Sequence, residues 1–296
     1  MDWLSQIKVP CERTPVFSHI PKTAMTSAIE SIKHSLRESG VRFLKKREDI
    51  KKDFIQGHIE HKRKEKSGNS AKINKYIENG TGNVIFLHAH SAYTIGYYSK
   101  KVLYFVILRD PIERIMSHYR QLVIIRFLAK NITLDDIFVK NKEEMLYKRV
   151  SSKTAKDYAI DTQNYWYQNY YTKFLGAGGP HKIRISTEKE KDQVIKNLKR
   201  SCICYESPKR GMIEVPAIIG ITERFEDTMK LFCKVGGWEI TDKKFHESKT
   251  RNNKYATDYT PSKELIEEIK FHNKFDYEIY NTALEVFDKQ LKHFEV

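Results

Sequence analysis

The chain has 296 residues and carries 53 Lys and Arg against 38 Asp and Glu, so its formal net charge is +15 at pH 7. Hydrophobic residues make up 40% of the chain and aromatic residues 12%, which is enough for a packed core and excludes a globally disordered protein. The positive charge indicates an anionic partner, such as nucleic acid, an anionic glycan, a phosphorylated cofactor or a membrane surface.

The hydropathy of the chain and its cysteines bear on where the protein resides. The longest apolar run, VLYFVIL at 102–108, is far shorter than the roughly 18 residues of a transmembrane helix. The N-terminal residues, MDWLSQIKVP, lack the basic and apolar regions of a secretory signal. We therefore expect a soluble protein without a transmembrane segment. Its four cysteines are too few for a disulfide framework, so we expect reduced thiols.

Short apolar runs rich in Val, Ile and Phe are typical of strands buried on both faces of a parallel sheet, and amphipathic helical segments alternate with them. This alternation predicts an α/β fold with an open, mostly parallel sheet flanked by helices. Since no repeat or linker divides the chain, we expect a single domain over 1–296. The predicted strands are 15–20, 83–89, 102–108, 182–185 and 215–221; the predicted helices are 27–40, 111–130, 223–237 and 261–294; the predicted loops are 64–83, 176–180 and 206–216.

The segment HIPKTAMTS, at 19–27, lies between the first predicted strand and the first predicted helix. A strand, a tight loop and a helix N-terminus can hold a phosphate through backbone N–H groups and the helix dipole. Lys22 adds a positive charge, and the hydroxyls of Thr23, Thr26 and Ser27 add donors. The loop lacks the glycines of the GxxxxGK[ST] nucleotide-binding loop. The alternative is an ordinary helix capped by Thr26 or Ser27.

His88, Ala89 and His90 follow the second predicted strand. Alternate residues of an extended chain share a face, so both imidazoles could point the same way. Three interpretations remain open: histidines at the edge of the core, a pair of metal ligands with His58 and His61 as partners, or a general base with its helper. No cysteine or carboxylate cluster with ligand spacing accompanies either pair.

The third segment, VLYFVILRDPIERIMSHY at 102–119, joins a predicted strand to a predicted helix. We expect Asp110 to cap a helix that begins at Pro111, with Glu113 completing an acidic variant of the capping box. These roles leave Arg109 unexplained. An Arg at the carboxyl end of a buried strand lies where ligands bind in such sheets, and Ser117, two turns into the helix, could share an anion with it.

In this order, the three segments resemble those of the Golgi-type carbohydrate sulfotransferase family, which uses 3′-phosphoadenosine 5′-phosphosulfate (PAPS), and within it the heparan sulfate and uronyl 2-O-sulfotransferase branch. HIPKTAMTS is similar to the family's 5′-phosphosulfate loop, ILRDPIERIMSHY to its 3′-phosphate element and FLHAHSAY to the branch's HGH segment. Supporting segments at 161–176, 218–232 and 248–287 follow in order, so the resemblance covers about residues 15–290.

This resemblance implies a P-loop-like sulfotransferase fold and a PAPS-dependent O-sulfotransferase that releases 3′-phosphoadenosine 5′-phosphate and needs no metal. Lys22 would contact the oxygen that bridges the sulfonate and the 5′-phosphate. Arg109 and Ser117 would hold the 3′-phosphate, and His90 would be the catalytic base with His88 as its neighbour. The other cofactor-binding residues implied are Thr23, Ala24, Met25, Thr26 and Ser27 in the first loop and Lys249, Thr250 and Arg251 in a basic closing loop.

The chain departs from the family at several points. Met25 and Ala89 stand where many relatives have Gly, and a large side chain at Met25 disfavours a positive φ there. Animal relatives also have a membrane anchor and lumenal disulfides, which this chain does not show. We therefore expect a cytoplasmic protein, or one of the Golgi lumen if an anchor has been removed.

The acceptor implied is a carbohydrate, and the positive charge favours an anionic polysaccharide rather than nucleic acid. Aromatic side chains in 157–171 could stack on sugar rings, or Tyr165, Trp166 and Tyr170 could be core residues of a helix. Two other classes of protein remain. One is an ATP-using kinase, disfavoured by the missing glycines and the lack of an obvious Asp for magnesium; the other is a non-enzymatic binder of anionic glycan or nucleic acid.

Overall fold

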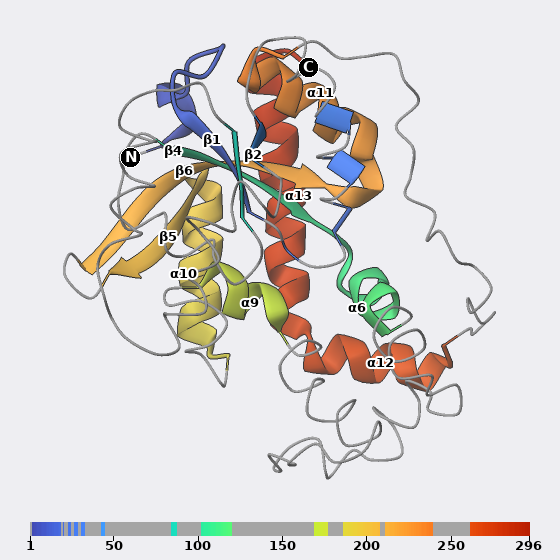
Figure 1. Cartoon of the computed structure of the whole chain (residues 1–296). Coiled ribbons are helices and arrows are strands. Elements are labelled where there is room, and N and C mark those ends of the chain that lie inside the picture. Colours follow the sequence, from blue (N-terminus) through green and yellow to red (C-terminus); the bar gives the residue numbers. More distant parts are fainter. Residues whose placement is uncertain are drawn as a thin grey trace.

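The structure is a computed structural model that describes residues 2–18, 20, 23–24, 27–28, 31–32, 43–44, 84–87, 102–119, 169–176, 186–207, 211–238 and 261–296. Within them lies a six-stranded sheet with the order β2–β3–β1–β4–β6–β5 (Figure 1). Neighbouring strands are parallel except for the β5–β6 pair, which is antiparallel. The predicted α/β fold with an open, mostly parallel sheet is thus confirmed. The strands are β1 (Thr14–Ser18), β2 (Phe43–Leu44), β3 (Val84–Leu87), β4 (Val102–Leu108), β5 (Cys202–Ser207) and β6 (Gly211–Ile221).

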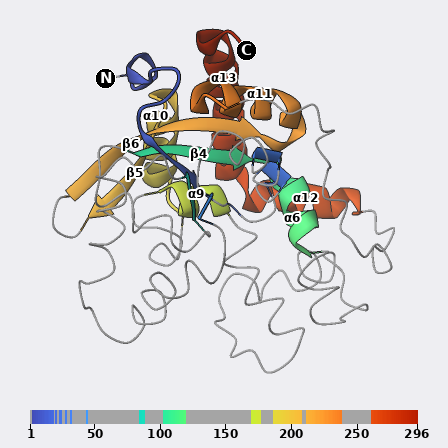
Figure 2. The ribbon, with the colours of Figure 1, turned by 45° about the horizontal axis from the view of Figure 1, so that its top comes forward.

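Helices pack around this sheet. The long C-terminal helix runs past β6, with two shorter helices beside it, α9 and α10 (Figure 1). Helix α6 continues directly from β4, and α12 packs against α6, as a second view shows (Figure 2). Residues 27–28 and 31–32 are helical, and the helices with described bounds are η1 (Leu4–Gln6), α6 (Pro111–Tyr119), α9 (Tyr170–Leu175), α10 (Glu188–Lys199), η5 (Thr222–Arg224), α11 (Phe225–Gly236), α12 (Lys263–His272) and α13 (Lys274–Phe294).

The loop predicted at 206–216 is wrong for 206–207 and 211–216, which are strand residues of the β5–β6 pair, from Ser207 with Gly211 to Cys202 with Pro216; residues 208–210 lie outside the described residues. β5 lies at the edge of the sheet, and its sequence CICYES mixes polar with apolar residues. Edge strands need no continuous apolar run, which is why the pattern used to find buried strands misses this one. The predicted strand 182–185 lies outside the described residues.

The helix predicted over 261–294 is also corrected, because it is two helices that meet at Asn273. The Asn273 side chain donates to the carbonyl of Ile269 and accepts from the backbone N–H of Asn169, both at 2.9 Å. An Asn amide that bonds to nearby backbone competes with helix continuation. Asn273 therefore ends one helix and ties the start of the next to the segment before α9.

One face of the sheet carries an aromatic cluster under α11. Phe17 of β1 stacks on Phe105 of β4 with ring centroids 5.0 Å apart, and Phe232 of α11 meets Phe105 edge-on at 4.8 Å. Gly220 lets the helix approach this closely, since a Cβ there would lie 2.3 Å from Cγ2 of Thr228. Such close packing fixes β6, and with it the residues that follow its carboxyl end, relative to β1 and β4.

A side chain from α13 completes the edge of β6 beyond the end of β5. The Gln290 amide accepts from the Ile219 N–H at 2.9 Å and donates to the Ala217 carbonyl at 3.0 Å. It is fully buried, as are both strand residues. Gln290 therefore supplies the hydrogen bonds that a neighbouring strand would otherwise make, and buried backbone groups need such partners.

A second polar cluster ties the N-terminal segment to the opposite end of β6. Arg200 donates from Nη1 and Nη2 to the two carboxylate oxygens of Glu214, at 2.6 and 2.7 Å. Trp3 donates from Nε1 to the same carboxylate at 3.2 Å and from its backbone N–H to the Arg200 carbonyl at 3.0 Å. This carboxylate thereby fastens the first residues to the β5–β6 hairpin.

The cysteines and the helices test two expectations from the sequence, reduced thiols and the lack of a transmembrane helix. All four cysteines, Cys11, Cys202, Cys204 and Cys233, are free, as expected for reduced thiols. Among the described helices, none combines the length and the apolar character that crossing a membrane requires.

Candidate active site

The carboxyl ends of the four central parallel strands lie at one edge of the sheet. Ser18, the last residue of β1, is in register with Leu87, the last residue of β3, and with Val106 of β4. The ends of β4 and β6 are likewise paired, Leu108 with Ile221. From β1 the chain proceeds to β2 and β3 on one side and later to β4 on the other, so β1 and β4 flank a topological switch point, where open α/β sheets bind ligands.

The loop after β1 is described at Thr23, Ala24 and Ser27. The buried Thr23 hydroxyl donates to the Ile20 carbonyl at 2.9 Å, so its proton stabilises the loop itself. Ala24 has a φ of 57°, in the left-handed region that residues with a Cβ adopt only at a cost. Its carbonyl accepts from the Ala28 N–H at 3.0 Å, which starts the following helix. Strain of this kind is found at ligand-binding loops, where the surroundings enforce it.

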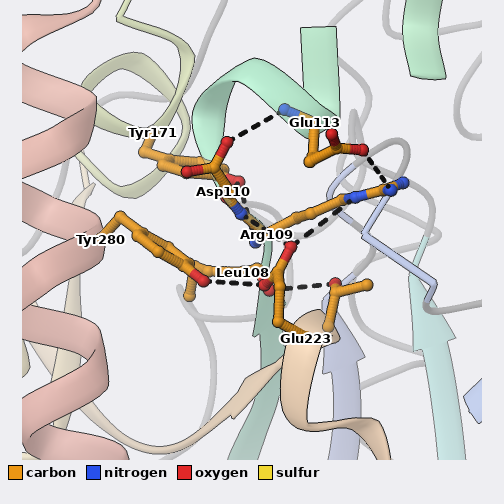
Figure 3. Close-up of polar contacts among 8 residues, drawn as sticks. Leu108, Arg109, Asp110, Glu113, Tyr171, Glu223 and Tyr280 are labelled. Carbon is orange, nitrogen blue, oxygen red and sulfur yellow. Dashed lines mark hydrogen bonds and ion pairs between the residues drawn. The ribbon is translucent and has the colours of Figure 1, made fainter. Parts of the chain in front are cut away.

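The Arg109 corner, by which we mean Arg109 and Asp110, joins β4 to α6 (Figure 3). One phenol holds the backbone of Arg109: the Tyr171 hydroxyl accepts from its N–H at 2.9 Å and donates to its carbonyl. Burial raises the pKa of Tyr171, so the hydroxyl stays protonated and remains a donor at neutral pH. A single side chain from α9 thus fixes the backbone at the end of β4.

The Arg109 side chain, which is 24% exposed, lies between two carboxylates. Its Nη2 donates to Oε2 of Glu113 at 3.1 Å, and its Nε lies 3.8 Å from Oε1 of Glu223 (Figure 3). The second distance is that of an ion pair rather than of a hydrogen bond. The guanidinium is therefore already arranged to hold anionic oxygens at the carboxyl end of β4.

Glu223 links this corner to two further elements. Its Oε1 accepts from the Asp110 N–H at 3.1 Å, and its Oε2 accepts from the Tyr280 hydroxyl at 2.7 Å. Burial, followed by the Glu223 carboxylate, raises the pKa of Tyr280, so this phenol also remains a donor. The preceding residue, Thr222, donates from its hydroxyl to the Leu108 carbonyl at 3.0 Å. The start of η5 is thus bonded to both the corner and α13.

Asp276 supports the corner from one helical turn before Tyr280. Its fully buried carboxylate accepts from the backbone N–H groups of Tyr171 and Thr172, at 2.9 and 3.2 Å. On balance the pKa of Asp276 is raised, because the effect of burial exceeds the opposite effects of the Arg114 charge and of these two donors. The carboxylate fixes the start of α9, and α9 in turn carries the Tyr171 hydroxyl that holds Arg109.

Comparison with known proteins adds the decisive observation: the sulfotransferase family matches residues 12–282. The chain belongs to the sulfotransferase family. No curated protein matches it. The family transfers sulfuryl groups and generally draws them from PAPS, so this protein is an enzyme of the transferase class. The match contains every described residue of the Arg109 corner and its supports.

The sulfotransferase begins α6 as the sequence predicts, but the capping box is only half formed. Pro111 is the first helical residue, and Asp110 accepts from the Glu113 N–H at 3.0 Å. The Glu113 carboxylate does not return to Asp110; it turns to Arg109, while the Asp110 N–H donates to Glu223. The expected capping box is therefore wrong in its second bond: the Glu113 carboxylate pairs with the charged Arg109 guanidinium, and the Asp110 N–H finds an equivalent carboxylate acceptor in Glu223.

The structure brings some predicted site residues together and leaves others outside the described residues. Arg109 and Ser117 belong to one strand–helix unit, and Thr23, Ala24 and Ser27 follow the adjacent strand β1. Tyr170 is fully buried, stacked on Phe174 with centroids 5.8 Å apart, so it is a core residue and does not stack on sugars. The predicted residues that lie outside are Lys22, Met25, Thr26, His88, His90, Lys249, Thr250 and Arg251, together with Tyr165 and Trp166.

Sequence reasoning missed Tyr171, Glu223 and Tyr280 as parts of this site. A signal existed for Glu223, because it follows the carboxyl end of a predicted strand just as Arg109 does. The two tyrosines lie in segments that support the resemblance, 161–176 and 248–287, but nothing local in the sequence assigned them to the corner, because they meet it only after α9 and α13 pack. Within the described residues, no three His, Cys, Asp or Glu side chains gather as a metal site would require.

Proposed function

We propose that this sulfotransferase transfers a sulfuryl group from PAPS to a hydroxyl group of a carbohydrate acceptor, as in the heparan sulfate and uronyl 2-O-sulfotransferase branch, and that residues 1–296 form one catalytic domain. The observation that carries the proposal is the Arg109 guanidinium, which lies between two carboxylates at the carboxyl end of β4. A group arranged to hold anionic oxygens at a topological switch point suits the 3′-phosphate that distinguishes PAPS from ATP.

The described residues fit the two ends of PAPS. Arg109, Glu113 and Ser117 are spaced by four residues, which aligns them along one side of α6 and its preceding turn. Arg109 and Ser117 would therefore share the 3′-phosphate. The strained loop at Thr23 and Ala24 and the helix start at Ser27 would meet the 5′-phosphosulfate, and Lys22 and Thr26 complete this segment in the sequence. Lys249, Thr250 and Arg251 would close over the nucleotide.

PAPS, when bound, supplies an activated sulfuryl group. His90 follows the end of β3 by three residues, and β3 is the neighbour of β1. We assign to His90 the removal of the proton from the acceptor hydroxyl, with His88 as its neighbour. We assign to Lys22 the stabilisation of the negative charge that develops on the leaving phosphate, so this step would draw on protein electrostatics and need no metal.

The net charge of +15 supports an anionic acceptor, such as a glycan that contains uronic acids. A positive surface raises the local concentration of such a polymer and speeds its association, and salt weakens the effect. We place the protein in the cytoplasm, or in the Golgi lumen if an anchor has been removed, and we expect no nucleic-acid partner.

Calorimetric titration with 3′-phosphoadenosine 5′-phosphate, ADP and ATP in the presence of EDTA tests the cofactor. We expect the 3′-phosphorylated nucleotide to bind at least about tenfold more tightly than the other two, because one charge-assisted contact is worth about 1.5–3 kcal/mol. Equal binding of the three nucleotides, or none, would overturn the proposal. It would favour a non-enzymatic binder of anionic glycan or nucleic acid, which salt-sensitive polymer binding would then reveal.

A further inference from the structure

The two carboxylates beside Arg109 differ in what else they contact. Glu113 lies in the first turn of α6 with 52% of its side chain exposed, and within the described residues its carboxylate contacts Arg109 alone. Glu223 contacts Arg109 Nε and also accepts from the Asp110 N–H and the Tyr280 hydroxyl. Of these two carboxylates, Glu223 is the one that also bonds to the Asp110 backbone and to α13.

The position of Glu223 is determined by the sheet and by α13. It follows β6 by two residues, and β6 is held in register with β4 through Leu108 and Ile221. Thr222 bonds to the carbonyl of Leu108, immediately before Arg109. Tyr280, which is 7% exposed, restrains the far oxygen of the Glu223 carboxylate. A carboxylate held from both sides in this way offers Arg109 a fixed partner.

We propose that Glu223 is the positioning residue for the contact between Arg109 and the 3′-phosphate, and that Tyr280 acts through it. Oε1 of Glu223 lies 3.8 Å from the inner nitrogen, Nε, and so restrains the guanidinium, whose outer nitrogens would meet the phosphate. Glu113 holds the outer nitrogen, Nη2, and a phosphate can replace this exposed carboxylate. This inference rests on the proposed function, because it takes the 3′-phosphate to bind at Arg109.

The test compares two nucleotides that differ only in the 3′-phosphate, 3′-phosphoadenosine 5′-phosphate and AMP. The dissociation constant of AMP divided by that of 3′-phosphoadenosine 5′-phosphate, both measured by calorimetry, isolates the contribution of that phosphate. We expect Glu223→Gln to reduce this ratio by about tenfold while the affinity for AMP stays unchanged. A merely structural defect would weaken both nucleotides together and leave the ratio intact.

Glu113→Gln is the matched control, because it makes the same chemical change in the other carboxylate beside Arg109. It removes a competitor of the phosphate rather than a support, so the ratio should equal or exceed that of the unmodified protein. Tyr280→Phe removes a hydroxyl that contacts Glu223, and we expect it to reduce the ratio by about two- to fivefold, as the loss of one hydrogen bond would. If Glu223→Gln does not fold, Tyr280→Phe decides alone.

The outcomes separate the two proposals. A ratio near one in the unmodified protein would overturn the proposed cofactor and this inference with it. A large ratio that persists in both Glu223→Gln and Tyr280→Phe would overturn the inference alone. An equal fall in Glu113→Gln and Glu223→Gln would also overturn it, because it would show an effect of charge without positioning.

Discussion

Two arginines at opposite ends of β6 meet carboxylates in different ways. Arg200 donates to both oxygens of one partner, Glu214, at 2.6 and 2.7 Å. Arg109 divides its contacts between two partners, with one hydrogen bond of 3.1 Å to Glu113 and one ion pair of 3.8 Å to Glu223. A planar guanidinium binds a single bidentate carboxylate most strongly. Arg200 is therefore held more strongly by its partner than Arg109 is by either of its two.

This difference separates stability from binding. Arg200 and Glu214 bond to each other in a bidentate pair and Glu214 also accepts from Trp3, and these bonds attach the N-terminal segment to the hairpin. Tyr171 fixes the backbone of Arg109, and two separate carboxylates, Glu223 and the exposed Glu113, contact its side chain. We therefore expect an anion to bind at Arg109, where it can replace the exposed Glu113 carboxylate, rather than at Arg200.

The largest expected effect is on the rate of catalysis, from a substitution of a residue that follows the carboxyl end of β3. We expect His90→Ala to lower kcat by about 100- to 10,000-fold, because it removes the general base, while nucleotide affinity and melting temperature stay unchanged. Sulfuryl transfer to a glycan acceptor measures the rate. His293→Ala, at an exposed position near the end of α13, is the control and should retain full activity. Full activity of His90→Ala would refute its role.

The next effect distinguishes the two arginines directly. Arg109→Ala should weaken 3′-phosphoadenosine 5′-phosphate by about 1.5–3 kcal/mol, since it removes charge-assisted bonds to the phosphate, and should change the free energy of unfolding little. Arg200→Ala should do the reverse, with about 1 kcal/mol lost from the free energy of unfolding and unchanged nucleotide affinity. Calorimetry and urea unfolding measure the two quantities. If both variants behaved alike, the comparison would fail.

The smallest effect concerns pH. Hydrogen bonds from Arg200 outweigh burial and lower the pKa of Glu214 below its ordinary value. A lowered folded pKa stabilises the protein above the unfolded value near 4.3, and this contribution is lost as the pH falls through the folded pKa. Glu214→Gln should therefore cost less than about 1 kcal/mol at pH 7, since the pair is partly exposed. In urea unfolding, its difference from the unmodified protein should begin to shrink below about pH 4.3 and vanish once the pH has fallen below the folded pKa; a difference independent of pH would contradict this.

The sequence predicted the parts of the fold that carry continuous apolar runs. β1, β3, β4 and β6 lie within or overlap the predicted strands, and β4 has the predicted bounds. Among the described strands, β2 and β5 were missed, because one has only two residues and the other lies at an edge with polar positions. The break at Asn273 was missed because its cause is a bond to Asn169, which is distant in the chain.

The sequence predicted the candidate site at a residue that local helix capping could not explain. Arg109 stood out because capping explained its neighbours and not itself. Its supports lie far away in sequence, Tyr171 on α9 and Glu223 after β6, and they meet it only through packing of the sheet and helices. Local patterns report the end of a strand, whereas the partners that orient a side chain there depend on the tertiary structure.

Gln290 also affects whether another protein chain can pair with the edge of the sheet. Beyond β5, the outer side of β6 would present unpaired N–H and C=O groups, which is the surface that another chain uses to add a strand. The Gln290 amide occupies those groups from α13, so this part of the sheet offers no template for intermolecular pairing. The helix that bears Tyr280 for the site thus also covers part of a sheet edge, which disfavours pairing with another chain there.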